Sequence, residues 1–248
     1  MKRILVAVMA VLALFSSSCS QTRATPSPVQ STPHNVKPKS ADFPLSAGAY
    51  WVYEGTVKWM VGRNVMQKDL TWKMEVVEMV ERGEIVGYAL RGHPSDLAWY
   101  EEGKQRSEYV IVQFGPDKFY KTDDLKALQR LKDETDSLNG LAHEAQLILD
   151  FPLLPGKRFG ELEQVNRTDG RYCWVVEQDK RILSKRINGV PSSEMIPEYT
   201  LHFVTLPDHV IVDFAPGVGI TRYEYVHHGT VSEVNVKLVE YHPGTVQR

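Results

Sequence analysis

Apolar and polar side chains alternate along residues 65–80 with a period of two. The apolar side chains fall on even-numbered positions: Met66, Leu70, Trp72, Met74, Val76 and Val80. Because successive side chains of a strand point to opposite faces, this period predicts a long strand with one buried face. Residues 50–61 show the same period on odd-numbered positions, so we expect the two segments to pair as a hairpin across Gly62-Arg63-Asn64.

Five further segments are predicted to be strands. Three of them are apolar on both faces, which is typical of strands in the middle of a sheet or between layers: 108–114, 171–176 and 209–214. Near the C-terminus, residues 220–226 and 231–241 are predicted to form a hairpin across the turn His227-His228-Gly229-Thr230.

Residues 122–149 break the strand pattern. Thr122 and Asp123 are predicted to cap a helix, and leucines follow at helical spacing: Leu125, Leu128 and Leu131. A second helical turn is expected between Leu138 and Leu149. The predicted fold is therefore mainly β. It is one or more strongly curved antiparallel sheets, or a sandwich, of about nine to eleven strands, with one or two short helices in the middle.

Two stretches of the chain repeat each other. Asp-Phe-Pro-Leu occurs at 42–45 and at 150–153, and each copy is followed by a glycine three residues later. A second pair of similar segments is YVIVQFGP at 109–116 and HVIVDFAP at 209–216. Either the chain contains two duplicated halves, 42–121 and 150–248, or the two regions converged on similar strand chemistry.

The repeated stretch has a physical interpretation as a strand opener. Proline fixes its own φ and favours an extended conformation at the phenylalanine before it. Gly48 and Gly156 permit a turn with positive φ, while the phenylalanine and leucine side chains can plug the end of a sheet. By the same reasoning, Pro216-Gly217 predicts a tight turn between two strands.

The N-terminus has the pattern of a secretory signal. Two basic residues precede the unbroken apolar run from Ile4 to Phe15, which is too short to span a membrane as a helix. Three serines then lead to Cys19, and this arrangement resembles a bacterial lipoprotein signal. The resemblance implies that residues 1–18 are removed and that Cys19 is lipidated, with palmitate among its acyl chains. Ordinary secretion, with cleavage near the serines, is the alternative.

Composition divides the rest of the chain into a tether and a folded body. Residues 19–41 are rich in proline, serine and threonine and are predicted to be a disordered tether behind Cys19. Residues 42–248 are predicted to be the β-rich extracytoplasmic domain. Five of the 29 basic residues but none of the 31 acidic residues precede Asp42, so this domain carries a formal charge of −7. That charge argues against nucleic acid as a partner and against electrostatic adhesion to anionic lipid headgroups.

Three segments of the body carry a resemblance to a group of proteins: FPLSAGAYWVYEG from Phe43, FAPGVGITRYEY from Phe214, and the closing strand VKLVEY. They resemble uncharacterised bacterial lipoproteins and secreted proteins that share a PL-x-x-G-x-x-W-x-Y start and an APGVG turn, some of them named TapB-like. The resemblance implies a β-rich envelope domain, and it supplies no catalytic residues.

The sequence contains no nucleophile elbow, zinc-protease motif or phosphate-binding loop. No catalytic residue, metal ligand or cofactor is predicted. The polar candidates are histidines and aspartates of the C-terminal strands: His202, Asp208, His209, Asp213, His227, His228 and His242. Adjacent residues of a strand point to opposite faces, so His227 and His228 are poor partners for one metal. Cys173 lies in an apolar run and is interpreted as a small apolar filler.

These observations predict a non-catalytic lipoprotein outside the cytoplasm with a structural or binding role, anchored through Cys19 to the bacterial cell membrane or outer membrane. Its expected partners are the membrane and either an envelope protein or an apolar ligand. The first alternative is a carrier or chaperone that holds a lipid or another apolar ligand against a curved sheet. The second is an envelope hydrolase or metal-binding protein that uses the histidines and aspartates of the C-terminal strands.

Overall fold

The computed structural model describes residues 42–179, 181–183, 186–191 and 195–244, which belong to one compact unit. The predicted signal peptide, the predicted lipidation site Cys19 and the predicted tether lie outside the described residues. Among the described helices, none is both long enough and apolar enough to cross a membrane.

Thirteen antiparallel strands form one sheet in the described part of the chain. They are β1 (Tyr50–Val61), β2 (Asn64–Arg82), β3 (Ile85–Arg91), β4 (Glu108–Phe114), β5 (Lys118–Thr122), β6 (Gln146–Asp150), β7 (Arg158–Phe159), β8 (Trp174–Val176), β9 (Arg181–Ile182), β10 (Pro197–Val204), β11 (Asp208–Ala215), β12 (Gly219–His227) and β13 (Glu233–His242). Three short helices accompany them: η1 (Pro94–Leu97), α1 (Lys126–Lys132) and α2 (Leu162–Val165).

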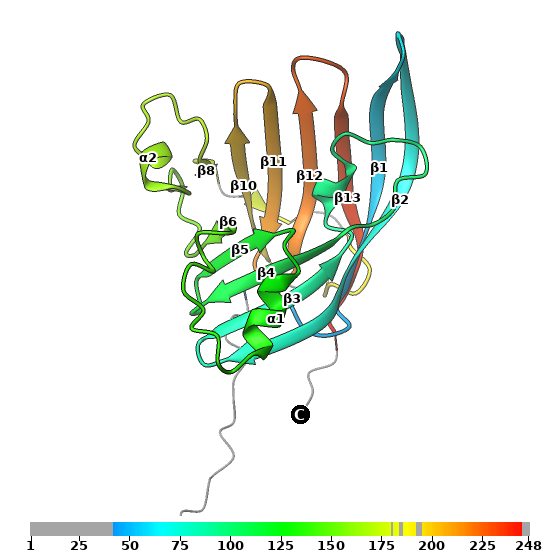
Figure 1. Cartoon of the computed structure of the whole chain (residues 1–248). Helices are drawn as coiled ribbons and strands as arrows, with labels where there is room; N and C mark the ends of the chain where they lie inside the picture. Colours follow the sequence, from blue (N-terminus) through cyan, green and yellow to red (C-terminus); the bar gives the residue numbers. More distant parts are fainter. Residues whose placement is uncertain (1–41, 180, 184–185, 192–194, 245–248) are drawn as a thin grey trace, which may run out of the picture. The chain divides into compact units, whose positions relative to one another are not determined.

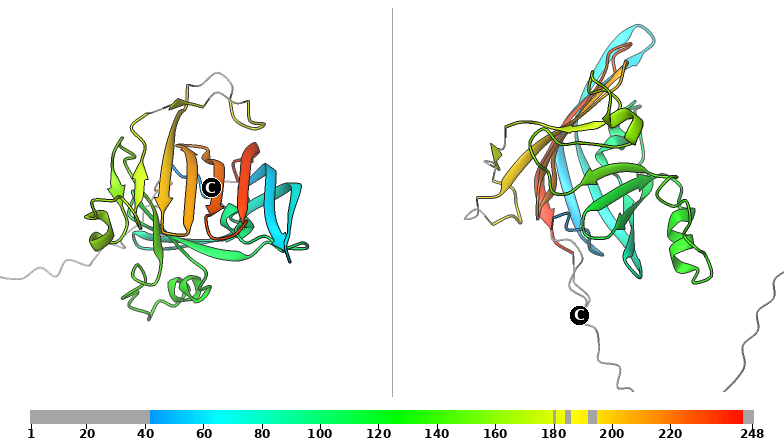
Figure 2. Two further views of the ribbon diagram at one scale, coloured as in Figure 1. Left: turned by 90° about the horizontal axis from the view of Figure 1, so that it is seen from above. Right: turned by 90° about the vertical axis from the view of Figure 1, so that its left-hand side faces the viewer.

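The chain follows the sheet in a simple path. It starts in the centre at β1 and meanders outward to the edge strand β6. It then crosses to the opposite edge at β7 and returns to β13, which pairs with β1; β9 is attached only to β10. The sheet bends so far that the edge strands β6 and β7 come into contact. Strands β3–β6 and β10–β13 thus lie on opposite sides of its concave face (Figures 1 and 2). The predicted curved antiparallel sheet is confirmed, as a single sheet with more strands than expected.

The hairpin predicted from the alternating pattern is present. β1 and β2 pair from Tyr50 opposite Glu75 to Val61 opposite Asn64, with a two-residue turn between them. Trp72, Met74 and Val76 are buried, as their parity predicts, whereas Met66 is exposed. The difference follows from length, because the tip of the hairpin lies beyond the part of the sheet that covers the core.

Two predicted elements are shorter than expected. Residues 171–176 form a strand only from Trp174, because Tyr172 has a positive φ of 62° and interrupts the extended backbone. The predicted second helical turn consists of one hydrogen-bonded turn, in which the Glu144 N–H donates to the Gly140 carbonyl at 3.2 Å. The residues that follow it form strand β6, so the prediction that the strand pattern is broken up to Leu149 is wrong from Gln146 onward.

Helix α1 packs on the convex face of the sheet, against β2, β3 and β4. Its buried face is formed by Ala127, Leu128 and Leu131. Leu125 precedes the helix and is exposed, and Asp124 rather than Asp123 accepts a hydrogen bond from the first turn, at 2.9 Å from Lys126 N. The buried side chains of α1 (Ala127, Leu128 and Leu131) join Val110 and Val112 of β4 in a small second core. This core is separate from the main core on the concave face.

The two strand openers make the same backbone contacts. In the first, Gly48 N donates to the Val76 carbonyl at 3.0 Å, and Val76 N donates to the carbonyl of the residue after the glycine at 2.9 Å. In the second, Gly156 N and Val176 N form the equivalent pair of hydrogen bonds, at 3.0 Å and 2.9 Å. Both glycines have positive φ, 78° and 79°. The interpretation of this stretch as a glycine turn that feeds a new strand is confirmed.

The openers also bring phenylalanines together. Phe43 and Phe151 meet Phe119 and Phe214 in a closed ring of four aromatic contacts, with centroid distances between 5.3 and 5.9 Å. We call these four residues the phenylalanine cluster. Three of them are fully buried or nearly so, and Phe151 is 7% exposed. The cluster fills one region of the concave face.

The second pair of similar segments does not correspond in side-chain direction. In β4, Val110 and Val112 face the convex side and pack near α1. In β11, the aligned Val210 and Val212 belong to the core of the concave face. A shift of one residue reverses the face of every side chain in a strand. The aligned residues of β4 and β11 therefore occupy different environments. A true duplication of the two halves stays a prediction.

Candidate ligand-binding site

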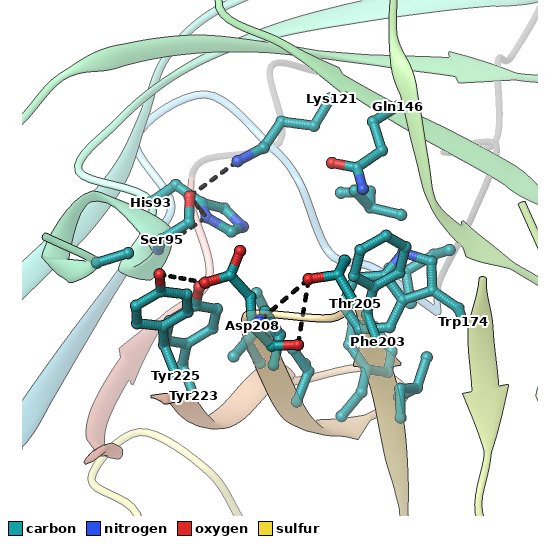
Figure 3. Close-up of a pocket in the computed structure, with 18 residues that line it drawn as sticks. His93, Ser95, Lys121, Gln146, Trp174, Phe203, Thr205, Asp208, Tyr223 and Tyr225 are labelled. Atoms are coloured by element: carbon teal, nitrogen blue, oxygen red, sulfur yellow. Dashed lines mark hydrogen bonds between the residues drawn. The ribbon is translucent and has the colours of Figure 1, made fainter. Parts of the chain in front are cut away.

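A cavity of about 230 Å³ opens on the concave face beside the phenylalanine cluster. It is lined by side chains of η1 and of six strands from both sides of the sheet: His93, Ser95, Ala98, Lys121, Gln146, Ile148, Leu149, Trp174, Leu201, Phe203, Thr205, Asp208, Val210, Val212, Phe214, Ile220, Tyr223 and Tyr225 (Figure 3). Most of this lining is apolar or aromatic. An apolar cavity of about 150 Å³ is enough to take up benzene, so this one has room for a larger apolar group.

A second hollow adjoins the cavity. It has a volume of about 760 Å³ and lies where β6 approaches β7 and β8. Gln146, Trp174 and Phe203 line both spaces. The second hollow is therefore a cleft that shares part of its wall with the cavity.

Helix η1 places polar groups at the cavity. It follows Gly92, whose positive φ of 79° turns the chain at the end of β3, and His93 caps it. The Asp96 carboxylate holds the helix against the chain leading into β4. It accepts hydrogen bonds from Ser107 N, at 2.8 Å, and from the Tyr109 hydroxyl. This anchoring fixes Ser95, which precedes Asp96, toward the cavity (Figure 3).

Ser95 lies between a lysine and a histidine. Lys121 Nζ of β5 donates to Ser95 Oγ at 2.8 Å, and Ser95 Oγ lies 2.8 Å from His93 Nδ1. His93 Nδ1 also accepts the Ser95 N–H at 3.2 Å, so this ring nitrogen is an acceptor and the serine hydroxyl donates to it. The Lys121 ammonium also sits over the Tyr109 ring, 4.6 Å from its centroid.

Burial changes the titration of both basic groups. It lowers the pKa of Lys121 to about 8, against the opposing influence of Asp96 and Asp123. Burial, with a smaller contribution from Lys121, holds the pKa of His93 well below 6.5. At neutral pH the lysine is therefore a cation and the histidine is neutral. A histidine that resists protonation this strongly is a poor base for activating Ser95.

Asp208 is the carboxylate on the opposite wall of the cavity. It accepts hydrogen bonds from the Tyr225 hydroxyl at 2.7 Å and from His227 Nδ1 at 2.8 Å. Burial acts to raise the pKa of Asp208, but these hydrogen bonds outweigh it and the pKa lies below the usual value. Asp208 is thus an ionised group whose charge is already satisfied by protein donors.

Trp174 forms part of the wall shared by the cavity and the cleft. Its ring packs against Phe159 and Phe203, and its side chain is buried. The indole Nε1 has no hydrogen-bond partner among the described residues. The Gln164 Oε1 atom, which lies in a residue lining the cleft, is also buried without a partner. Such atoms are rare in folded proteins and indicate sites where water or a ligand binds.

The histidines and aspartates singled out in the C-terminal strands do not form one site. His202 bridges His209, at 3.0 Å, and Glu177, at 2.5 Å. Asp213 is buried away from the cavity, paired with Arg181 at 2.7 Å. Two histidines of this set remain: His228 is exposed and donates its backbone N–H to the Pro207 carbonyl at 2.7 Å, and His242 stacks on Tyr50. Within the described residues, no group of three or more potential ligands is arranged to hold a metal ion.

Cys173 is fully buried and unpaired. Its sulfur lies 3.7 Å from the Gly170 carbonyl, and burial raises the pKa of its thiol. A thiol in this setting stays protonated, which agrees with its interpretation as a small filler of the core.

Three polar residues that border the cavity were not among the candidates predicted from the sequence: His93, Ser95 and Lys121. One signal was present. Lys121 shares its parity in β5 with Phe119, a fully buried residue, so the lysine had to point toward the core. His93 and Ser95 carried no comparable signal, because they reach the cavity through a turn and a short helix.

No protein-family model matches the chain, and no curated protein matches it significantly. Among solved structures, it is similar to a protein of Bacteroides fragilis that is described as a predicted exported protein with a YmcC-like fold. The similarity covers 81% of this chain and 98% of the other, with 11% sequence identity and a TM-score of 0.36.

Proposed function

We propose that this protein is a non-catalytic, extracytoplasmic lipoprotein that binds an apolar ligand on the concave face of its sheet. The observation that carries the proposal is the cavity of about 230 Å³ with mostly apolar walls. It borders a cleft between the sheet edges, and among the described residues the buried Trp174 Nε1 in their shared wall has no hydrogen-bond partner. Ligand sites in proteins typically combine such apolar walls with a few polar groups. The N-terminal sequence supports export and attachment through Cys19.

The proposal is tested by filling the cavity. Ala98 lines it, and Ala98→Leu adds three carbon atoms there. We expect this variant to fold normally and to lose at least tenfold in affinity for a neutral apolar dye. Ala47→Leu is the matched control, because it adds the same atoms in the first opener, outside both hollows.

Native mass spectrometry supplies the second readout. The purified wild-type chain is expected to carry an apolar molecule in addition to any acyl chains on Cys19, and Ala98→Leu is expected to carry less of it. If the wild-type mass contains only the Cys19 acyl chains and no dye binds, the carrier proposal is wrong.

A second candidate role is the binding of an envelope protein at the tip of the β1–β2 hairpin. Val61 and Val65 are 56% and 55% exposed there, beside exposed Met66. A photo-crosslinking residue in place of Val65 is expected to capture a protein of the envelope that the same residue at Val77, exposed further along β2, does not. Identical crosslinking patterns from the two positions would count against this role.

A further inference from the structure

The Lys121 ammonium is a cation without a matching anion. In the described part of the chain, its nitrogen has one hydrogen bond, to Ser95 Oγ, and no carboxylate lies within 4.0 Å. The next lysine of the same strand, Lys118, differs in this respect, because its ammonium lies 3.5 Å from Asp150. Removing a charge from water without a partner is costly. Lys121 is half-buried and its ammonium contacts the Tyr109 ring but no carboxylate, so it keeps N–H donors for an anion.

The groups around Lys121 are suited to an anion at the rim of the cavity. An ammonium has three N–H donors, and Ser95 takes only one of them. Gln146 lies directly opposite Lys121 in the pairing of β5 with β6, and its amide lines both the cavity and the cleft. Figure 3 shows both side chains at the same side of the cavity. Trp174 adds an unpartnered N–H donor on the shared wall.

The other charged groups near this rim compensate it only in part: Asp96 and Asp123 act to raise the pKa of Lys121, but among the described residues no carboxylate forms an ion pair with it. Asp96 is occupied by Ser107 N and the Tyr109 hydroxyl, and Asp123 is exposed. Asp208, on the far wall, is occupied by Tyr225 and His227. His93 is neutral because of its burial. Lys121 therefore supplies a positive charge at this rim, and the ionised Asp208 carboxylate lies on the opposite wall.

We propose that the ligand is an amphiphile with an anionic headgroup, a carboxylate or a phosphate, which pairs with Lys121 while its hydrocarbon chain enters the cavity. This inference rests on the proposed function and names the ligand class. Charge-assisted hydrogen bonds from an ammonium are among the strongest that a protein offers such a group. The apolar wall accommodates the hydrocarbon chain, and the cleft adjoins the cavity where Gln146 lines both spaces.

The test compares matched amphiphiles by calorimetric titration of the full chain. Dodecanoate and dodecyl phosphate are expected to bind more tightly than dodecanol, and inorganic phosphate alone is expected not to bind. Lys121→Met is expected to weaken binding of dodecanoate about 10- to 100-fold, the loss expected for one hydrogen bond to a charged group. It should leave dodecanol binding within about threefold. Lys121→Arg should restore most of the affinity for the anion, and Lys118→Met should change nothing.

Three outcomes would overturn the inference. If dodecanol and dodecanoate bind equally to the wild type and to Lys121→Met, the headgroup assignment is wrong while the carrier proposal stands. If no amphiphile binds the wild type, both proposals are wrong. If Ser95 becomes acylated by a dodecanoate ester, the cluster is a nucleophile site rather than an anion site.

Discussion

The concave face of the sheet contains two neighbouring regions that are filled differently. In one, the phenylalanine cluster packs four rings into mutual contact, with no polar group among them. In the other, apolar side chains surround a cavity that His93, Ser95, Lys121 and Asp208 also border. Phe214 belongs to both regions, since it completes the cluster and lines the cavity.

The two regions have opposite effects on the stability of the fold. Aromatic pairs of this geometry add about 0.5–1.5 kcal/mol each beyond the burial of their surface, so the phenylalanine cluster stabilises the fold. A cavity and a half-buried lysine without a carboxylate partner do the opposite, because both lower stability. These destabilising features are what the proposed binding role would explain.

The motifs that carried the resemblance belong to the packed region. Trp51 Nε1 donates to the Val218 carbonyl at 2.6 Å, and Gly217 N donates to the carbonyl of Asp42 at 2.9 Å. The opener and the turn Ala215-Pro216-Gly217-Val218-Gly219 are thus in direct contact. A Cβ on Gly219 would lie only 3.1 Å from the Trp51 indole nitrogen. The two motifs occur together because they close the same part of the sheet.

The largest expected effect comes from opening a hole in the packed region. Phe119→Ala removes the ring that contacts both opener phenylalanines. We expect it to lower the free energy of unfolding by about 3–5 kcal/mol, as is typical for a buried phenylalanine. Val210→Ala, in the half-buried wall of the cavity, should cost roughly 1 kcal/mol. Urea titration of both variants measures the decrease in the free energy of unfolding. Similar decreases would mean that the two regions are packed alike.

Much of the fold could be predicted from periodicity. The alternation in 50–61 and 65–80 predicted the central hairpin because each of these strands has one face in the core and one in solvent. Strand β6 was not predicted, because its residues, QLILD, form a short apolar run in which neither period is resolved. Strands β7 and β9, of two residues each, are too short to show any period. Their pairing depends on neighbours that are distant in sequence.

The candidate site could not be predicted in this way. Its polar groups come from positions 93, 95, 121 and 208, which only the closure of the sheet brings together. The histidines and aspartates that stood out in the sequence cluster along the chain, but alternation sends Asp208 to the cavity and Asp213 to an arginine pair elsewhere. What could be predicted was the absence of a strong local motif and the richness in aromatic residues, and neither distinguishes a filled core from a hollow one.

A smaller effect is expected from the opener glycine. Gly48 has a φ of 78°, and a Cβ there would meet no atom within 4 Å, so backbone strain alone sets the cost. Gly48→Val is expected to lower the free energy of unfolding by about 2 kcal/mol, because β-branched residues are strongly disfavoured at positive φ. Gly48→Asn, which tolerates this conformation better, should lose less. Dye binding at the cavity should be unchanged in both, and a fully stable valine variant would refute the role assigned to this glycine.

The smallest effect is expected at Lys121, and its sign is opposite. Lys121→Met replaces a buried cation by an apolar side chain of similar length, so we expect the ligand-free protein to become more stable by about 1 kcal/mol at pH 7. Burial lowers the pKa of Lys121 in the folded state to about 8, against an ordinary value of 10.5. Below about pH 8 the lysine is charged in both states, and the full cost of burying the charge is present in the wild type.

This gain in stability should therefore depend on pH. Between about pH 8 and 10.5, the unfolded wild-type chain holds more protons on Lys121 than the folded chain, so wild-type stability rises through this window relative to that of Lys121→Met. The difference between the two proteins should be largest below pH 8 and should shrink toward pH 10.5. Thermal unfolding at several pH values measures it. A gain that stays constant across this range, or a loss of stability at pH 7, would show that Lys121 is already neutralised within the protein, and the cavity rim would then offer no charge to an anionic ligand.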